Sequence, residues 1–152
     1  MHNMNNNNSL DVIYSGISDG MRKFSSTEEK MEYLSTALYD SFEHYFWVGF
    51  YYPNEKEMII GPSAGPPACS SIGYEGVCGA AYNSGQSVIV ANVDEFPGHI
   101  VCDHNSKSEV VVPVKDSDGE IIALLDVDSD RLDAFNKKDA IFLEKLVSEL
   151  TA

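Results

Sequence analysis

The stretch EVVVPVKDSDGEIIALLDVD, residues 109–128, contains two β-rich runs on either side of a turn signal. The runs cover residues 109–114 and 120–128, and the dipeptide Asp118-Gly119 between them is typical of a tight β-hairpin turn. Side chains alternate between two faces along each run. The stretch therefore predicts two paired antiparallel strands.

The hairpin brings three carboxylates together in either of two registers. A two-residue loop would set Glu109 opposite Asp128, whereas a four-residue loop would set Glu109 opposite Asp126. Asp126 and Asp128 share a strand face because they are two residues apart. Like charges directly opposite one another destabilise a sheet by a few tenths to about 1 kcal/mol, so the cluster suggests a function. Solvated strand ends and a carboxylate site for Ca²⁺ or Mg²⁺ are the alternatives.

Periodic spacing of apolar residues predicts the elements outside this hairpin. A capping box at Ser26 and Glu29 starts the second of four expected helices, Gly85 ends the third, and Asn136 caps the last. The order predicts an α+β fold in which an antiparallel sheet is covered by helices. The helices are expected around residues 10–17, 27–43, 77–83 and 140–150, further strands at 46–52, 58–60 and 87–91, and irregular loops at 61–67 and 92–108.

The 152-residue chain has 24 Asp and Glu residues against 10 Lys and Arg residues, a formal net charge of −14. Its length predicts one domain over residues 10–152, preceded by a disordered Asn-rich tail over residues 1–9. Such an acidic field would repel nucleic-acid backbones and anionic membrane surfaces, so neither is expected as a ligand. Three cysteines, no secretory signal and no apolar run of membrane-spanning length predict a cytoplasmic protein with free thiols.

Aromatic side chains on an expected strand give a second candidate site. Trp47 and Tyr51 flank Gly49 on one face of residues 46–52, which would leave room between the rings for an apolar ligand group. Packing of both rings beneath a helix is the alternative.

The cysteines are Cys69, Cys78 and Cys102, and they lack the spacing of a zinc site or of a C-x-x-C redox motif. The sequence therefore predicts no metal, and thiol-redox chemistry is the functional interpretation that remains. Cys102 lies in the aperiodic loop beside His99 and His104, and an imidazolium there would help to hold its thiolate. Buried small hydrophobes and exposed loop histidines are the alternatives.

Six sequence blocks, which include all three cysteines, occur in the order in which a known family carries them. The blocks are FWVGFY at 46–51, GPSAGPPAC at 61–69, GVCG at 76–79, FPGHIVCD at 96–103, SEVVVP at 108–113 and LDVDS at 125–129. On these blocks the sequence resembles the free methionine-(R)-sulfoxide reductases, which are single GAF domains. The resemblance covers residues 27–150 and implies a GAF-like antiparallel sheet with helices packed on it, usually in a homodimer.

The resemblance implies that the protein reduces free L-methionine-(R)-sulfoxide to methionine without a cofactor. It makes Cys102 the nucleophile, Cys78 the main resolving thiol and Cys69 a further candidate for resolution. The sulfenic acid left on the nucleophile would condense to an intramolecular disulfide, which a thioredoxin-type dithiol would reduce. A GAF domain that only binds a small molecule as a sensor and a thiol redox switch without a substrate are the alternatives.

The resemblance also places the substrate against carboxylates at its polar end and aromatic rings around its S-methyl group, namely Glu109, Asp126, Asp128, Trp47 and Tyr51. Like charge and burial both favour a neutral acid, so at least one of the three carboxyl pKa values is expected to rise. We expect Glu109 or Asp128 to hydrogen-bond the sulfoxide oxygen and Asp126 to bind the ammonium group.

Overall fold

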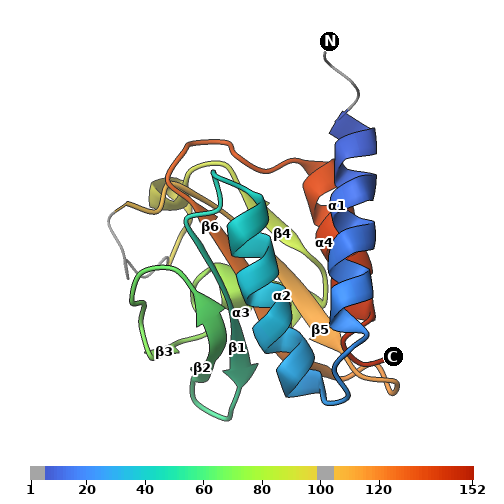
Figure 1. Cartoon of the computed structure of the whole chain (residues 1–152). Helices are drawn as coiled ribbons and strands as arrows, with labels where there is room; N and C mark the ends of the chain where they lie inside the picture. The colour runs from blue at the N-terminus through green and yellow to red at the C-terminus, as the bar shows by residue number, and fades with distance from the viewer. Residues whose placement is uncertain (1–5, 99–104) are drawn as a thin grey trace.

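The expected hairpin lies inside a six-stranded antiparallel sheet in the computed structural model, which describes residues 6–98 and 105–152 (Figure 1). The strands are β1 (Trp47–Pro53), β2 (Met58–Ala64), β3 (Ser71–Ile72), β4 (Val88–Val90), β5 (Ser108–Lys115) and β6 (Ile121–Ser129). Their order in the sheet is β3-β2-β1-β6-β5-β4, so both hairpin strands are paired on two sides. The predicted α+β fold with an antiparallel sheet is confirmed.

The hairpin reaches one of the two expected registers through a turn that was not expected. The loop has three residues, 117–119, and it is closed by the Asp116 N–H, which donates to the carbonyl oxygen of Glu120 at 2.9 Å. Farther along the ribbon the register shifts by one residue at a bulge. Glu109 therefore lies opposite Asp128, as a two-residue loop would have placed it.

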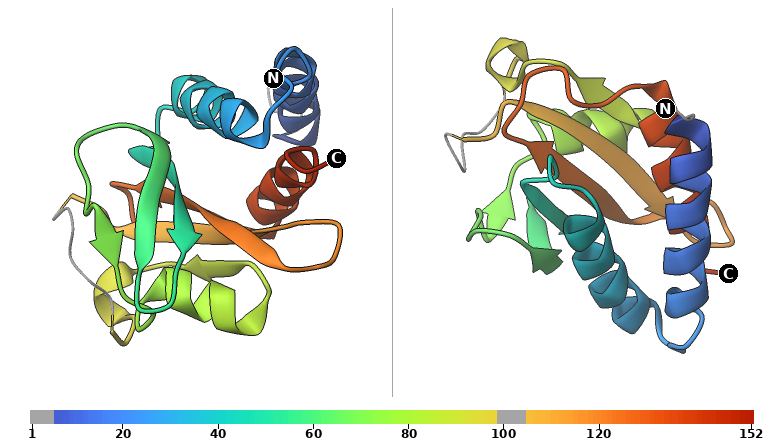
Figure 2. Two further views of the ribbon diagram at one scale, coloured as in Figure 1. Left: turned by 90° about the horizontal axis from the view of Figure 1, so that it is seen from below. Right: turned by 45° about the horizontal axis from the view of Figure 1, so that its top comes forward.

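Helices cover both faces of the sheet (Figure 2). α2 (Thr27–Ser41) and α4 (Lys137–Ser148) pack on one face, and α1 (Asn6–Met21) packs against both of these helices. α3 (Val77–Ser84) packs on the opposite face, where the short helix η1 (Val93–Glu95) adds Val93 to the apolar cluster. Among the described residues, no helix has both the length and the apolar character that crossing a membrane requires.

The helix ends follow the capping signals in the sequence. The Ser26 hydroxyl accepts a hydrogen bond from the Glu29 N–H at 3.1 Å, and Asn136 and Asp139 form the same reciprocal cap at the start of α4. Gly85 ends α3 with a φ of 71°, a left-handed conformation that glycine adopts without strain. The predicted second, third and fourth helices are therefore confirmed.

Four segments differ from their predicted structure, and two of them, β3 and η1, are short elements where the sequence predicts none. α1 begins at Asn6, inside the Asn-rich segment for which the sequence predicts a disordered tail. β2 continues through Pro62, where the sequence predicts an irregular loop. The β1–β2 register shifts between Gly49 and Tyr51, so Pro62 lies at an irregularity in the ladder, which is where a residue without an N–H is tolerated.

Side chains alternate between the two faces along the central strands. On β1, Val48 and Phe50 pack with α2, whereas Trp47 and Tyr51 pack in the cluster that contains α3. On β6, Asp126 lies on the α3 side, next to the first turn of that helix. The polar side chains of the hairpin are thus collected beneath α3.

Candidate active site

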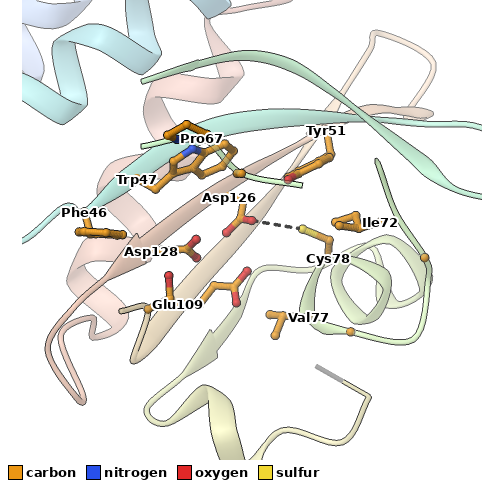
Figure 3. A pocket seen from close by; sticks show the side chains of 14 residues that line it. Phe46, Trp47, Tyr51, Pro67, Ile72, Val77, Cys78, Glu109, Asp126 and Asp128 are labelled. Carbon is orange, nitrogen blue, oxygen red and sulfur yellow. Dashed lines mark hydrogen bonds between the residues drawn. The ribbon is translucent and has the colours of Figure 1, made fainter. Parts of the chain in front are cut away.

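A pocket lies between α3 and the sheet, where the hairpin carboxylates are placed (Figure 3). It encompasses about 660 Å³ of space between the atoms, a figure that includes the solvent at its open mouth. Six of the eight residues that the sequence marks as site residues line it. The full lining is Phe46, Trp47, Tyr51, Pro67, Ala68, Ile72, Gly73, Gly76, Val77, Cys78, Ser106, Glu109, Asp126 and Asp128.

Two of the three carboxyl groups are removed from water. Glu109 and Asp126 are 5% and 6% exposed, whereas Asp128, opposite Glu109, is half-buried. Over residues 6–98 and 105–152 the one ion pair joins Arg22 to Asp19, so neither buried carboxyl group has a basic partner there. A buried carboxylate without a counter-ion is costly, and protonation is the usual relief.

Burial and mutual repulsion hold these acids in their neutral forms. Burial, reinforced by the charge of Asp128, raises the pKa of Glu109 to about 8. Burial raises the pKa of Asp126 well above its usual range, and the charge of Glu109 and a hydrogen bond with that residue add to the effect. The expectation that at least one carboxyl pKa rises therefore agrees with the geometry, and the two acids titrate as a coupled pair.

Cys78 is a buried free thiol in contact with this pair. Its Sγ donates to Oδ2 of Asp126 at 3.8 Å, while the buried Oδ1 of Asp126 receives no hydrogen bond. Burial and the charge of Asp126 raise the pKa of the Cys78 thiol well above its usual range. Because the thiolate is the reactive form, this cysteine is a poor nucleophile at neutral pH.

Cys69 differs from Cys78 in its redox state, because it is held in a disulfide. Its carbonyl oxygen accepts a hydrogen bond from the Tyr51 hydroxyl at 2.9 Å, which ties the segment after Ala68 to the aromatic wall of the pocket. The predicted nucleophile Cys102 and the neighbouring histidines 99 and 104 lie outside the described residues.

The aromatic wall comes from β1. The rings of Trp47 and Tyr51 lie 5.9 Å apart and are tilted by 32°. A Cβ atom on Gly49 would lie 2.3 Å from the Trp47 ring, so the space above this glycine is filled by the ring itself. The interpretation that Gly49 leaves room for a ligand between the rings is therefore wrong, because the Trp47 ring occupies that space, although Trp47 and Tyr51 both line the pocket.

The first turn of α3 adds a feature that the sequence interpretation missed. Gly76, Val77 and Cys78 line the pocket as the N-cap and first two residues of the helix, and Gly76 offers no side chain to cap it. Backbone N–H groups at a helix start carry partial positive charge and bind anions. The signal was present in the sequence, since Gly76 directly precedes the predicted helix.

The GAF domain family matches residues 28–152. The free methionine-R-sulfoxide reductase of Saccharomyces cerevisiae is 37% identical over 142 residues, which are 90% of this chain and 79% of the yeast protein. The chain belongs to the free methionine-R-sulfoxide reductase family of GAF domains.

GAF domain-containing protein A of Dictyostelium discoideum is 43% identical over 119 residues, 77% of this chain and 74% of that protein. The free methionine-R-sulfoxide reductase of Neisseria meningitidis, solved in complex with its substrate, superposes with a TM-score of 0.90 at 33% identity and covers 99% of this chain and 91% of that one.

The resemblance inferred from the six sequence blocks is thus confirmed, and so is the GAF-like fold. Other pocket residues of this GAF domain could not be marked in advance, among them Phe46, Pro67, Ile72 and Ser106. They come from separate loops and strands and share no local spacing, so only folding brings them together.

Proposed function

We propose that this protein reduces free methionine-(R)-sulfoxide to methionine in the pocket between α3 and the sheet. One observation carries the proposal: an apolar aromatic wall lines the same pocket as a buried carboxyl pair with raised pKa values. A methyl sulfoxide has an apolar methyl group and an oxygen that must be protonated as it leaves, so it complements both features. The name of the yeast relative supports the same reaction.

The buried acids would act on the sulfoxide oxygen. Trp47 and Tyr51 would pack around the S-methyl group, while Glu109 and Asp126 would donate hydrogen bonds to the oxygen. With a pKa of about 8, Glu109 is largely protonated at neutral pH and can still release its proton as the S–O bond breaks. This assignment moves Asp126 from the ammonium group to the oxygen, because a neutral buried acid binds a cation poorly.

The two charged ends of the amino acid would bind at the other polar features of the pocket. Asp128 is the least buried of the three carboxyl groups and would bind the α-ammonium group. The N–H groups at the start of α3, which no side-chain cap satisfies, would bind the α-carboxylate. A methionine sulfoxide within a peptide lacks both charges, so we propose a preference for the free amino acid.

The reducing electrons would come from the protein's cysteines. The Cys102 thiolate would attack the sulfoxide sulfur, the oxygen would take up a proton, and methionine would leave as the oxygen is transferred to give a sulfenic acid. A second thiol would then attack that sulfenic acid, forming a disulfide and releasing water. An external dithiol of the thioredoxin type would reduce the disulfide and complete the cycle.

We assign resolution to Cys69 instead of Cys78, reversing the order that the resemblance implies. Cys69 takes part in a disulfide, whereas Cys78 is a buried free thiol whose pKa is raised. We expect Cys69→Ser to lower thioredoxin-dependent turnover by at least about 10-fold. Cys78 would then be the remaining resolving thiol, and it would attack the sulfenic acid slowly because little of it is thiolate. Methionine formed in the first turnover should stay stoichiometric. Cys78→Ser is the matched variant and should keep thioredoxin-dependent turnover. If Cys78→Ser lost this turnover while Cys69→Ser kept it, Cys78 would be the resolving thiol.

A coupled assay tests the proposed function. The protein is supplied with thioredoxin, thioredoxin reductase and NADPH, and NADPH oxidation is followed with each epimer of free methionine sulfoxide. We expect turnover with the R epimer and none with the S epimer. Saturable binding of methionine sulfoxide without NADPH oxidation would favour the sensor, and disulfide formation with peroxide alone would favour the redox switch.

A further inference from the structure

Cys78 has no role in the proposed cycle, yet it points at the two buried acids of the pocket (Figure 3). We propose that Cys78, Glu109 and Asp126 form a binding site for a zinc-class divalent cation. One ligand atom from each of the three residues lies within 4.8 Å of the other two, and all three side chains are buried. The site rests on this geometry and does not depend on the reductase function.

The spacing fits a small tetrahedral ion. Zinc binds thiolate sulfur at about 2.3 Å and carboxylate oxygen at about 2.0–2.2 Å, so tetrahedral angles place the sulfur and the oxygen about 3.5 Å apart. Sγ of Cys78 and Oδ2 of Asp126 are 3.8 Å apart, and no two of the three ligand atoms are more than 4.8 Å apart, so rotations of the side chains would have to draw them together around an ion. The pocket beside them leaves a fourth position for water, as in zinc sites with three protein ligands.

A second observation points to a missing ligand. Oδ1 of Asp126 receives no hydrogen bond from the protein. Asp126 is only 6% exposed, so water does not readily supply one. No basic side chain of the described ranges pairs with Asp126 or Glu109. Protons on these groups compensate for the charge when no cation is bound, since the pKa values of all three groups are raised. A divalent cation would replace those protons, and it would give Oδ1 a partner if Asp126 binds it through both carboxylate oxygens.

The donor set selects the class of cation. Mg²⁺ and Ca²⁺ prefer shells made of oxygen, whereas one thiolate with two carboxylates suits borderline and soft ions such as Zn²⁺, Co²⁺ and Cd²⁺. This differs from the hard-cation alternative that the three carboxylates alone suggest, because the thiol becomes visible only in the fold. The cation would occupy the acids assigned to the sulfoxide oxygen, so cation and substrate would exclude each other.

Cadmium absorption tests the site without any measurement of turnover. The chain has three cysteines, so Cys69→Ser with Cys102→Ser leaves Cys78 as the sole thiol. Titration of this protein with CdCl₂ should give a thiolate-to-cadmium charge-transfer band that saturates at one ion per chain. ZnCl₂ should abolish the band, and MgCl₂ at the same concentration should leave it unchanged.

Two further substitutions in this background decide whether the carboxylates are ligands. Asp126→Asn should raise the cadmium dissociation constant at least about 10-fold, and Glu109→Gln should act in the same direction. Asp94→Asn, at an exposed carboxylate on η1, is the matched control and should change nothing. No band in the folded protein, an unchanged dissociation constant in both carboxylate variants, or displacement by MgCl₂ would each overturn the proposal. The reductase assay is independent, so either proposal can fail alone.

Discussion

Leu125 and Asp126 are neighbours on β6, yet they belong to opposite faces of the sheet with opposite physical roles. Leu125 packs in the apolar cluster beneath α2 and α4, where strands and helices contribute almost only hydrocarbon. Asp126 faces α3, in a pocket that buries two acids and a thiol. Burial of hydrocarbon on one face stabilises the fold. Burial of acids on the other face is destabilising and shifts their pKa values.

One sheet can combine these two roles because its strands present different side chains on each face. Because side chains alternate along a strand, a single stretch of β6 anchors the core and carries the site at the same time. The rigid apolar face fixes the backbone that positions the acids. The two faces should therefore respond differently to substitution, activity being lost on one and stability on the other.

The largest effect is expected at Asp126. Asp126→Asn removes a proton donor without changing the shape of the side chain, so kcat and kcat/KM for methionine sulfoxide should fall together by about 100-fold or more. The free energy of unfolding at pH 8 should not fall, because the amide cannot acquire a buried charge. Steady-state kinetics and urea unfolding measure both quantities. Wild-type kinetics in this variant would show that Asp126 is not the donor.

The reverse pattern is expected one residue earlier. Leu125→Ala opens a cavity beneath the helices and should lower the free energy of unfolding by about 2–5 kcal/mol. The folded protein should keep kcat within about 3-fold of wild type at 25 °C, because Leu125 points away from the pocket. A loss of kcat as large as that at Asp126 would mean that the two faces are not separable.

The pH dependence of stability should sharpen the contrast. The pKa of Glu109 is raised from 4.5 to about 8, so the folded protein binds this proton more tightly than the unfolded chain. Its contribution to stability is complete below about pH 4.5 and is lost as the pH rises towards 8. Glu109→Gln cannot lose a proton, so its free energy of unfolding relative to wild type should increase by about 1–4 kcal/mol between pH 5 and pH 9.

The control for this prediction lies on the same hairpin. Glu120 is exposed, and Glu120→Gln should give a stability difference from wild type that barely changes between pH 5 and pH 9. Urea unfolding at each pH measures both differences. If the free energy of unfolding relative to wild type followed the same course with pH in the two variants, Glu109 would not be a buried neutral acid.

The smallest effect is expected at the start of α3. Val77→Pro removes one backbone N–H, and proline is accepted at the first helical position after an extended residue such as Gly76. The KM for methionine sulfoxide should rise about 3- to 10-fold with little change in kcat, since a typical hydrogen bond contributes about 0.5–1.5 kcal/mol net. Val77→Ala keeps the N–H and serves as the control. Equal KM values in both variants would show that the α-carboxylate of the substrate does not bind at this helix end.

Much of the fold followed from local signals. The hairpin, the capping boxes at Ser26 and Asn136 and the glycine stop at Gly85 each depend on residues within a few positions of one another. β2 through Pro62 did not follow, because its structure depends on a register shift against another strand. The same limit applied to Trp47, whose ring covers Gly49 in a way that alternation alone could not reveal.

That Glu109, Asp126 and Asp128 share a face could be predicted from the sequence alone, because strand period and hairpin pairing are local properties. The folded structure was needed to show that α3 covers this face and brings Cys78, 48 residues earlier in the chain, to 3.8 Å from Asp126. That contact changes the chemistry, because a carboxylate on an open sheet stays ionised while one sealed beneath a helix keeps its proton. Burial depends on distant segments packing together, and no local pattern encodes it.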